Sequence, residues 1–452
     1  MTEPLECRIE WIDAPGIRDE GLARTFARFE LWVGGRCVTQ ALDKRGSAIV
    51  NGTNISLLPL AAWIVDSWWT ARFEAPFVAR VASVRDARWP RERRWHERHG
   101  WLSSREGFAV PEVVWYRGEA GAVRVDWLQD AGSFDAMPLQ FLSSGSALVA
   151  PDIVERELGR IVEGSLTRCE GLASSLVEAL RERWGLILSG TADERRTCKR
   201  AARLGLDAYD ADDVDDRLAA LLARTDLAVG EPVLDDLLDV VDEASVANLE
   251  AQLGQLGALL DEPNAALTPA PRLAEARART AAVRGRPYER GYERARILRR
   301  DVLGLADDVV GGALDIAIEA SLLPPADVRE APSPFTFRDV HALAAGAPDT
   351  PFVVTRPERQ REGQRFDRAR ALDALVSSET PRLVTASFDP DQQESRAFAA
   401  ELLAPAALLR RQLTSRFVDR GDIAAAAAQL EVSPMLIVHQ LRNHHVAEVI
   451  DD

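Results

Sequence analysis

Cysteine is scarce in this chain of 452 residues, and long apolar stretches are missing. The four cysteines, Cys7, Cys37, Cys169 and Cys198, are scattered without a C-x-x-C pair, which disfavours a disulfide framework and a structural zinc site. No stretch of about 18 apolar residues occurs, and the N-terminus lacks a basic segment followed by an apolar one. We therefore expect reduced thiols, a cytoplasmic location and no membrane partner.

Positive charge is also in deficit. Lys and Arg total 55 against 71 Asp and Glu, so the formal charge is −16. Because nucleic-acid binding relies on Lys and Arg that neutralise phosphates, this balance disfavours nucleic acid as a partner and leaves only local basic patches. The chain also lacks G-x-S-x-G, a phosphate loop and a dinucleotide fingerprint, so nothing supports a hydrolase site in its N-terminal part.

The composition is that of a soluble globular protein, with 46% hydrophobic and 28% charged residues. The length predicts roughly three domains, and we expect a multidomain α+β fold. Strand-like runs with turn signals predict a β-rich, Trp-containing domain over residues 1–145. These runs are FARFELWVGG, GRCVTQALD, VPEVVWYRG and AGAVRVDWL, and a helix is predicted at 58–74.

The pattern becomes helical after residue 145. Leu, Ala and Val recur at three- and four-residue spacing, which predicts a helical domain over 146–265. Its acidic cluster fails the EF-hand pattern, so we expect Asp212 or Asp213 to cap a helix that starts near Val214. Residues 262–272, EPNAALTPAPR, have the composition of a linker, and a third domain is predicted over 273–452.

The segment WPRERRWHERHGWL (89–102) combines Arg, His and Trp. Such a surface can hold an anionic or stacked ligand, but we expect Trp95 and Trp101 to anchor the segment to the core while the arginines stay solvated. His96 and His99 are three residues apart, so they lack the one-face geometry of an H-E-x-x-H zinc motif.

Three stretches in the C-terminal third carry the main functional signal. RPYERGYERARILRRDVLGL (286–305) contains a Gly-x-x-x-Ala helix, QRFDRARALDALV (364–376) follows, and ESRAFAAELLAP (394–405) is the most specific. Together they resemble the ImmA/IrrE metallopeptidase family, whose patterns include R-F-x-x-A-H-E-x-x-H and E-x-x-x-F-A-x-E-L-L-x-P. The resemblance implies a mainly α-helical, zincin-like domain over 273–452. Known members of that family commonly cleave or relieve DNA-binding repressors.

The catalytic positions of the second stretch depart from the family pattern. Where the family has its first His, its Glu and its second His, this chain has Arg370, Ala371 and Ala374. Histidines four apart on a helix hold zinc, and the adjacent Glu acts as general base on zinc-bound water. Arginine stays protonated and alanine has no donor atom, so we expect no zinc and no other cofactor.

Glu394 stands where the resemblance implies the third zinc ligand. Without facing histidines, we predict that Glu394 pairs with Arg370, so that an ion pair replaces the metal bridge. The alternative is that both side chains face solvent. Arg365 matches a scaffold position and belongs to an arginine-rich stretch, 356–370, that could bind an anion or an acidic partner in the vacated cleft. A second such stretch lies at 284–300, and acidic residues interspersed in both favour a solvated helix face.

Residues 421–446, GDIAAAAAQLEVSPMLIVHQLRNHHV, have the helix, turn, helix order of a helix-turn-helix. The acidic chain around this segment favours a packing role over DNA recognition. The polar groups of its second helix are mainly Gln440, Arg442 and Asn443. His444 and His445 point different ways on a helix and have no carboxylate at ligand spacing, so we do not expect them to bind metal.

Three functions remain open. The first is a non-catalytic pseudo-metallopeptidase that binds or regulates a protein partner, in the bacterial stress, toxin–antitoxin or phage-defence settings that the resemblance implies. The second is an active zinc metallopeptidase with ligands recruited from elsewhere, such as His96, His99 or His341. The third is a DNA-binding transcriptional regulator that uses the helix-turn-helix-like segment. We favour the first, because the site that would carry the family's chemistry is what has changed.

Overall fold

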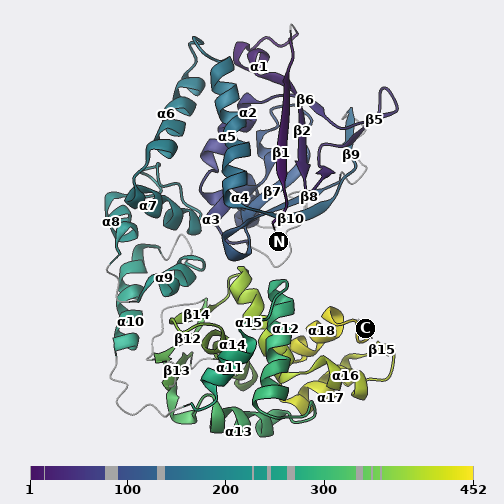
Figure 1. The fold of residues 1–452 in the computed structure, drawn as a ribbon, viewed down its shortest axis with the longest axis vertical. Helices are drawn as coiled ribbons and strands as arrows, with labels where there is room; N and C mark the ends of the chain where they lie inside the picture. The colour runs from purple at the N-terminus through teal and green to yellow at the C-terminus, as the bar shows by residue number, and fades with distance from the viewer. Residues whose placement is uncertain are drawn as a thin grey trace. The chain divides into compact units, whose positions relative to one another are not determined.

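The protein is mixed α+β, with a β-rich N-terminal region and a helical C-terminal part, as the sequence predicts (Figure 1). The structure, a computed structural model, describes residues 2–14, 16–76, 90–129, 138–225, 229–241, 246–261, 270–331, 339–347, 350–356 and 359–450. The chain divides into two compact units, residues 1–224 and 225–452. The helices predicted as a separate domain over 146–265 are therefore shared between two units.

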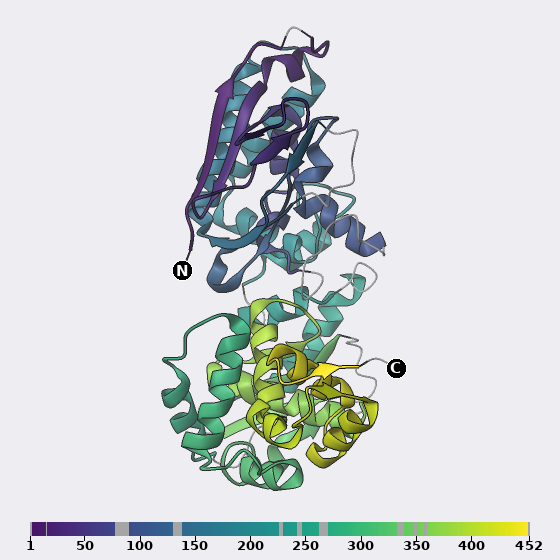
Figure 2. The same ribbon diagram turned by 90° about the vertical axis from the view of Figure 1, so that its right-hand side faces the viewer.

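The first unit contains three antiparallel sheets. Their orders are β1-β2-β3 with β6 also paired to β2, β10-β8-β7, and β5-β4-β9. The strands are β1 (Leu5–Trp11), β2 (Phe26–Val33), β3 (Arg36–Cys37), β4 (Ala41–Asp43), β5 (Ala48–Val50), β6 (Thr53–Ser56), β7 (Glu112–Arg117), β8 (Val123–Leu128), β9 (Leu139–Phe141) and β10 (Gly145–Val149). All four strand-like runs of the sequence are thus confirmed. β1 and β2 run side by side in Figure 2, and alternate residues of β1 are buried, as expected for a sheet with one face on the core.

Helices cover this sheet system. They are α1 (Glu20–Arg24), α2 (Leu58–Asp66), α3 (Thr70–Phe73), α4 (Pro90–His99), α5 (Pro151–Arg168), α6 (Ser175–Ser189), α7 (Ala192–Arg203) and α8 (Asp216–Ala223). The helix predicted at 58–74 is broken, because α2 ends at Asp66 and α3 begins at Thr70. This break places the Arg72 guanidinium 4.4 Å from the ring of Trp68. The N-cap of α8 is Asp215, which accepts a hydrogen bond from Leu218 N at 2.7 Å. The prediction of Asp212 or Asp213 as the cap was therefore wrong by at least two residues.

The arginine- and tryptophan-rich segment at 89–102 behaves as an anchor. Trp95 and Trp101 are both buried, as predicted, and the ring of Trp101 packs against that of Trp115 at 5.4 Å. His99 is fully enclosed, with Nδ1 2.5 Å from the carbonyl oxygen of Trp115 and Nε2 2.9 Å from Oε2 of Glu74. These contacts join His99, the last residue of α4, to β7 and indicate a structural role for this histidine.

The second unit is built around a four-stranded sheet of order β11-β13-β12-β14, in which β11 and β13 are parallel and the other pairs antiparallel. Its elements are α9 (Glu231–Leu238), α10 (Leu249–Asp261), α11 (Leu273–Thr280), α12 (Pro287–Ile297), the π-helix η5 (Leu298–Val302), α13 (Gly311–Ser321), β11 (Val328–Glu330), β12 (Val340–Ala347), β13 (Thr350–Thr355), α14 (Arg361–Ser377), β14 (Arg382–Thr385), α15 (Pro390–Leu403), α16 (Ala406–Gln412), β15 (Phe417–Val418), α17 (Arg420–Leu430), α18 (Pro434–Asn443) and β16 (Glu448–Val449). Most of the predicted linker, 262–269, lies outside the described residues.

The core of this unit lies between the sheet and the three helices that contain the family-like stretches. α14 packs on β12, β13 and β14, and α15 packs between α14 and α12. Gly291 of α12 approaches α15 closely, since an added Cβ would stand 2.3 Å from the carbonyl oxygen of Glu394. The Gly-x-x-x-Ala helix of the sequence is therefore the helix that contacts α15.

The last two helices form a sharply bent pair. α17 has a capping box made by Asp419 and Asp422, and α18 begins at Pro434 after the N-cap Ser433. Glu431 between them adopts a left-handed conformation with φ of 52°. The two helices are bent by 107°. No single described helix has the length and apolarity of a membrane span, and only this bent pair taken together passes that test.

Candidate functional site

The candidate site lies along one face of α14. Asp367, Arg370 and Asp373 recur at three-residue spacing, and all three are buried. The opposite positions Ala369, Leu372 and Leu375 match the apolar scaffold of the sequence pattern and pack into the core. A helix with three buried charges must satisfy each of them with partners from neighbouring elements, because an unpaired buried charge is strongly destabilising.

Arg370 is satisfied entirely by neutral groups. Its side chain is 1% exposed. Nε donates to Ser395 Oγ at 3.1 Å, Nη2 donates to Thr385 O at 2.8 Å and to Gln392 Oε1 at 2.6 Å, and Nη1 lies 3.3 Å from His341 Nδ1. Burial, together with the nearby Arg396, lowers the pKa of Arg370 to about 9. Position 370 thus holds a buried cation, and among the described residues no carboxylate is in direct contact with it.

The predicted ion pair between Arg370 and Glu394 is corrected by these contacts. Glu394 is 6% exposed and accepts from Arg290 at 2.5 Å and from Arg294, both on α12. Arg294 also donates to Asp373 Oδ1 at 2.6 Å. The alternative that both residues face solvent is corrected as well, because both are buried. The physical reason is the close approach at Gly291, which brings the arginines of α12 to Glu394 before any side chain of α14 reaches it.

The Arg294 guanidinium therefore bridges α14 and α15 through two carboxylates. Burial raises the pKa of Asp373 to about 6, against the opposing effect of Arg294. Arg294 itself has a raised pKa: burial alone would lower it, but Asp373 and Glu394 together outweigh that penalty. Sequence reasoning missed this bridge, although the spacing of Arg290 and Arg294, four residues apart, places them on one face of α12.

Ala371 and Ala374 are the other two residues that the sequence comparison singled out on this helix. Ala371 is fully buried in the core, and Ala374 packs against the same core. Neither carries a donor or acceptor atom in its side chain. With arginine at the first position, this residue set does not fit a zinc ion, and Glu394 is held by two cations instead.

The outer edge of β14 is closed by side chains. Leu383 N donates to Asp236 Oδ2 at 2.9 Å, and Leu383 O accepts from Gln392 Nε2 at 2.8 Å. Thr385 N donates to Gln392 Oε1 at 2.9 Å, and Thr385 O accepts from Arg370. An extended peptide that added to this edge would need the same four backbone groups. Asp236 of α9 and Gln392 of α15 were not identified from the sequence, since both act through backbone groups of β14, which no side-chain motif reports.

His341 of β12 joins the cluster from the sheet side. Its Nδ1 lies 3.3 Å from Arg370 Nη1 and 3.5 Å from Asp367 Oδ1. Arg359 donates to the other carboxylate oxygen of Asp367 at 2.6 Å. Although burial raises it, His341 and Arg359 hold the pKa of Asp367 below its usual value. His341 had no evident partner in the sequence, and the structure supplies two.

Arg365 is a clamp in the structure. It donates to the carbonyl oxygens of Leu430 and Glu431 at the end of α17, and to Gly311 O. Its Nε also contacts both oxygens of Asp315 on α13. The last carbonyl groups of a helix have no partners within the helix, so Arg365 satisfies the C-terminal end of α17. It is occupied by these contacts and is not presented to a ligand.

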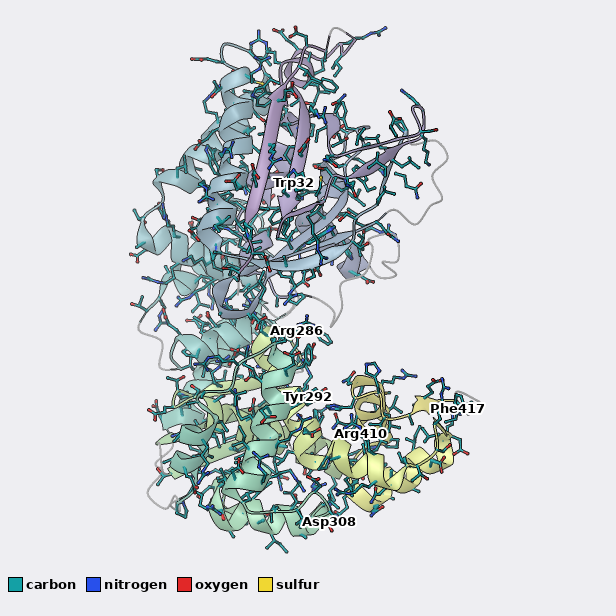
Figure 3. All side chains as sticks on the ribbon, turned by 45° about the vertical axis from the view of Figure 1, so that its right-hand side comes forward. Trp32, Arg286, Tyr292, Asp308, Arg410 and Phe417 are labelled. Carbon is teal, nitrogen blue, oxygen red and sulfur yellow. The ribbon has the colours of Figure 1, made fainter. Side chains whose placement is uncertain are left out.

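The second helix of the helix-turn-helix-like pair is tied to α15 and α12. Gln440 is buried and donates to Glu401 Oε2 at 3.1 Å and to Ala404 O at 2.7 Å. Tyr292 of α12, labelled in Figure 3, accepts from Asn443 at 3.2 Å and packs its ring 4.4 Å from that of His444. Of the polar groups on α18, Arg442 is exposed.

Among the residues that the structure describes, no three His, Cys, Asp or Glu side chains are placed to hold a metal ion. The described part of the chain also contains a small apolar cavity in the first unit, lined by Trp63, Trp68 and Trp115 among others. Its volume of about 10 Å³ is room for about one water molecule, which excludes it as a ligand site. Comparison of the chain with protein-family models, with curated proteins and with solved structures found no match.

Proposed function

We propose that this chain is a pseudo-metallopeptidase: a non-catalytic protein that binds or regulates a protein partner. The observation that carries the proposal is the position of Arg294. A zinc ion in an ImmA/IrrE-like site would join the motif helix to Glu394, and here the Arg294 side chain joins Asp373 of α14 to Glu394 of α15. An arginine side chain that makes this connection supports the proposal that the domain keeps the shape of a peptidase site without its metal.

The closed edge of β14 supports the same proposal. A peptidase must hold an extended substrate beside its catalytic centre, and strand addition is a common way to do so. Here Asp236, Gln392 and Arg370 occupy the backbone groups of β14 that such a substrate would need. A partner would then be bound by other surfaces. Bacterial stress response, toxin–antitoxin control and phage defence are the settings that the resemblance implies.

The metal content of the full chain, purified without chelator, tests the proposal directly. We expect no stoichiometric zinc by inductively coupled plasma mass spectrometry, and no cleavage of a casein or repressor substrate. The variant R370H/A371E/A374H serves as the control, because it restores the family's ligands beside Glu394. Near-stoichiometric zinc in the wild-type protein, with proteolysis abolished both by a chelator and by Glu394→Ala, would instead establish an active peptidase with unusual ligands.

A second candidate function is DNA binding by α17 and α18. It is favoured by their 107° bend and three-residue turn, which match a helix-turn-helix, and by the exposed Arg442. The burial of Gln440 favours the packing role instead. Salt-sensitive DNA binding that is lost in Arg442→Glu would support the DNA-binding function, and no mobility shift at low salt would remove it.

A further inference from the structure

His341 lies at an irregular point of the sheet. The pairing of β12 with β14 shifts register between Val340 and Ala342, so His341 is the residue left over at this bulge. Bulges re-aim a side chain that regular pairing would leave on one face of the sheet. The side chain of His341 is 16% exposed and points to α14, where Asp367 and Arg370 are its neighbours.

The two neighbours make opposite demands on the same ring nitrogen. Nδ1 of His341 lies 3.3 Å from Arg370 Nη1 and 3.5 Å from Asp367 Oδ1. A guanidinium can only donate a hydrogen bond, and an ionised carboxylate can only accept one. Nδ1 can therefore bond Arg370 only when it carries no proton, and Asp367 only when it carries one.

The Oδ1 atom of Asp367 also points to an exchange of partners. This atom is buried and has no hydrogen-bond partner among the described residues, while Oδ2 of the same carboxylate is bonded to Arg359. A buried carboxylate oxygen without a partner is costly. A protonated His341 is the nearby group that would satisfy it.

We infer that His341 is a proton-operated switch, which transfers the contact between β12 and α14 from Arg370 to Asp367, one helical turn away. In the neutral state, Nδ1 accepts from Arg370 and the ring proton resides on Nε2. When the ring takes a second proton from solvent, Nδ1–H donates to Asp367 Oδ1 and Arg370 Nη1 loses its acceptor. The switch requires only these side chains, so it is independent of the proposed binding role.

The surrounding charges set the pH at which the switch operates. Asp367 and Arg370 face His341 from α14, and Arg359 faces it from the segment before α14. Arg396 of α15 and Asp389 at its N-cap act on Arg370 behind them. Burial is the largest effect and lowers the pKa of His341 below 6.5, although Asp367 opposes it. The ring is thus neutral at pH 7, and the exchange occurs on acidification.

Nuclear magnetic resonance of the full chain labelled with ¹⁵N-histidine tests this inference, with the His341 signals assigned by their loss in His341→Gln. At pH 7.5 we expect the Nε2–H tautomer. We expect the His341 ring to titrate below the ordinary histidine pKa of 6.5, because burial favours the neutral ring. Asp367→Asn should lower the midpoint of His341 by about one pH unit, because the protonated ring loses its anionic acceptor.

Two arginine variants should act in the opposite direction. Arg370→Gln removes the donor that favours the neutral ring, and should raise the midpoint by about one pH unit. If Arg370→Gln does not fold, Arg359→Gln gives the same sign, because Arg359 is partly exposed and its removal leaves Asp367 more available to His341. An Nδ1–H tautomer at pH 7.5 would overturn the inference. So would shifts of the same sign in the aspartate and arginine variants, or no shift in either.

Discussion

Arg294 is a buried charge with buried partners, a setting in which one substitution has a large effect on stability. It is buried between Asp373 and Glu394, and neither carboxylate can turn to solvent when the guanidinium is removed. We expect Arg294→Leu to destabilise the second unit by about 3–5 kcal/mol, the usual cost of breaking a buried ion pair from one side. Chemical denaturation measures this. Arg300→Leu is the control, since Arg300 is exposed and forms its ion pair with the neighbouring Asp301. A similar loss in both variants would contradict the bridge.

Asp373 predicts a pH dependence of defined sign. Burial raises its folded-state pKa to about 6, above the usual value of 3.8. The folded state therefore binds the proton more tightly than the unfolded state, and this residue's contribution to stability falls as the pH rises from about 4 to about 6. Relative to Asp373→Asn, the wild-type protein should lose up to about 3 kcal/mol across that range. Parallel unfolding curves at each pH measure the difference. A difference that is constant or grows in favour of the wild type contradicts the raised pKa.

The residues of the site were only partly predictable. The sequence placed residues 370, 371 and 374 on one helix, and the structure has all three in α14. It assigned the wrong partner to Glu394, because the choice between Arg370 and Arg294 depends on the distance between helices that lie about a hundred residues apart in sequence. The spacing of a motif shows which side chains share one face of a helix, whereas the packing of that helix against others decides which ion pairs form.

The contact of α12 with α15 depends on a glycine at one position. A Cβ at Gly291 would lie 2.3 Å from Glu394 O and 2.8 Å from Phe398 N, which are backbone atoms that cannot rotate away. We expect Gly291→Val to destabilise the second unit by about 3 kcal/mol or more, because the two helices must separate. Gly254→Ala in α10 is the matched control. It has open space around it and should stabilise by about 0.5–1 kcal/mol.

Both variants are compared by thermal unfolding of the full chain. Equal and small effects at the two glycines would contradict the close packing of α12 on α15. Loss of Glu394 pairing in Gly291→Val, without loss of the remaining fold, would show in addition that this contact is what positions Arg294.

The clamp at Arg365 predicts a local effect on the C-terminal helices. Arg365→Leu leaves the carbonyl oxygens of Leu430 and Glu431 without their donor, and frees α17 from α14. We expect faster amide hydrogen exchange in α17 and α18, and a loss of about 3 kcal/mol in their local stability. Arg368→Leu on the exposed face of α14 should leave exchange in these helices unchanged. Equal exchange in the two variants would contradict the clamp.

Elements were predicted better than their boundaries. β1, β2, β7 and β8 follow from apolar alternation and turn residues, which act locally. The break after Asp66 in the predicted helix 58–74 lies beside the contact of Arg72 with Trp68, a tertiary contact that local propensity does not report. The predicted helical region 146–265 begins too early, because β10 extends to Val149, but its described residues from 151 onward are mainly helical. The same pattern could not show that α5 packs on β1 and α2 while α9 packs on β14.

At the scale of the whole molecule, each compact unit has a large hydrophobic core of its own among the described residues. One is formed by residues between Leu5 and Ile187, and the other by residues between Ala270 and Leu441. We expect residues 1–224 and 225–452, expressed separately, each to fold with a cooperative unfolding transition, because each buries its own core. Circular dichroism and thermal unfolding test this. A half that lacks cooperative unfolding would contradict the division after Arg224.

The closed edge of β14 also bears on how this protein behaves at high concentration. A strand at the edge of a sheet with free N–H and C=O groups can template a strand from another molecule, which is a route to aggregation. In the second unit, side chains from three helices occupy those groups on Leu383 and Thr385. Substituting Gln392 would thus do more than disturb a polar cluster: it would expose a template for intermolecular strand pairing.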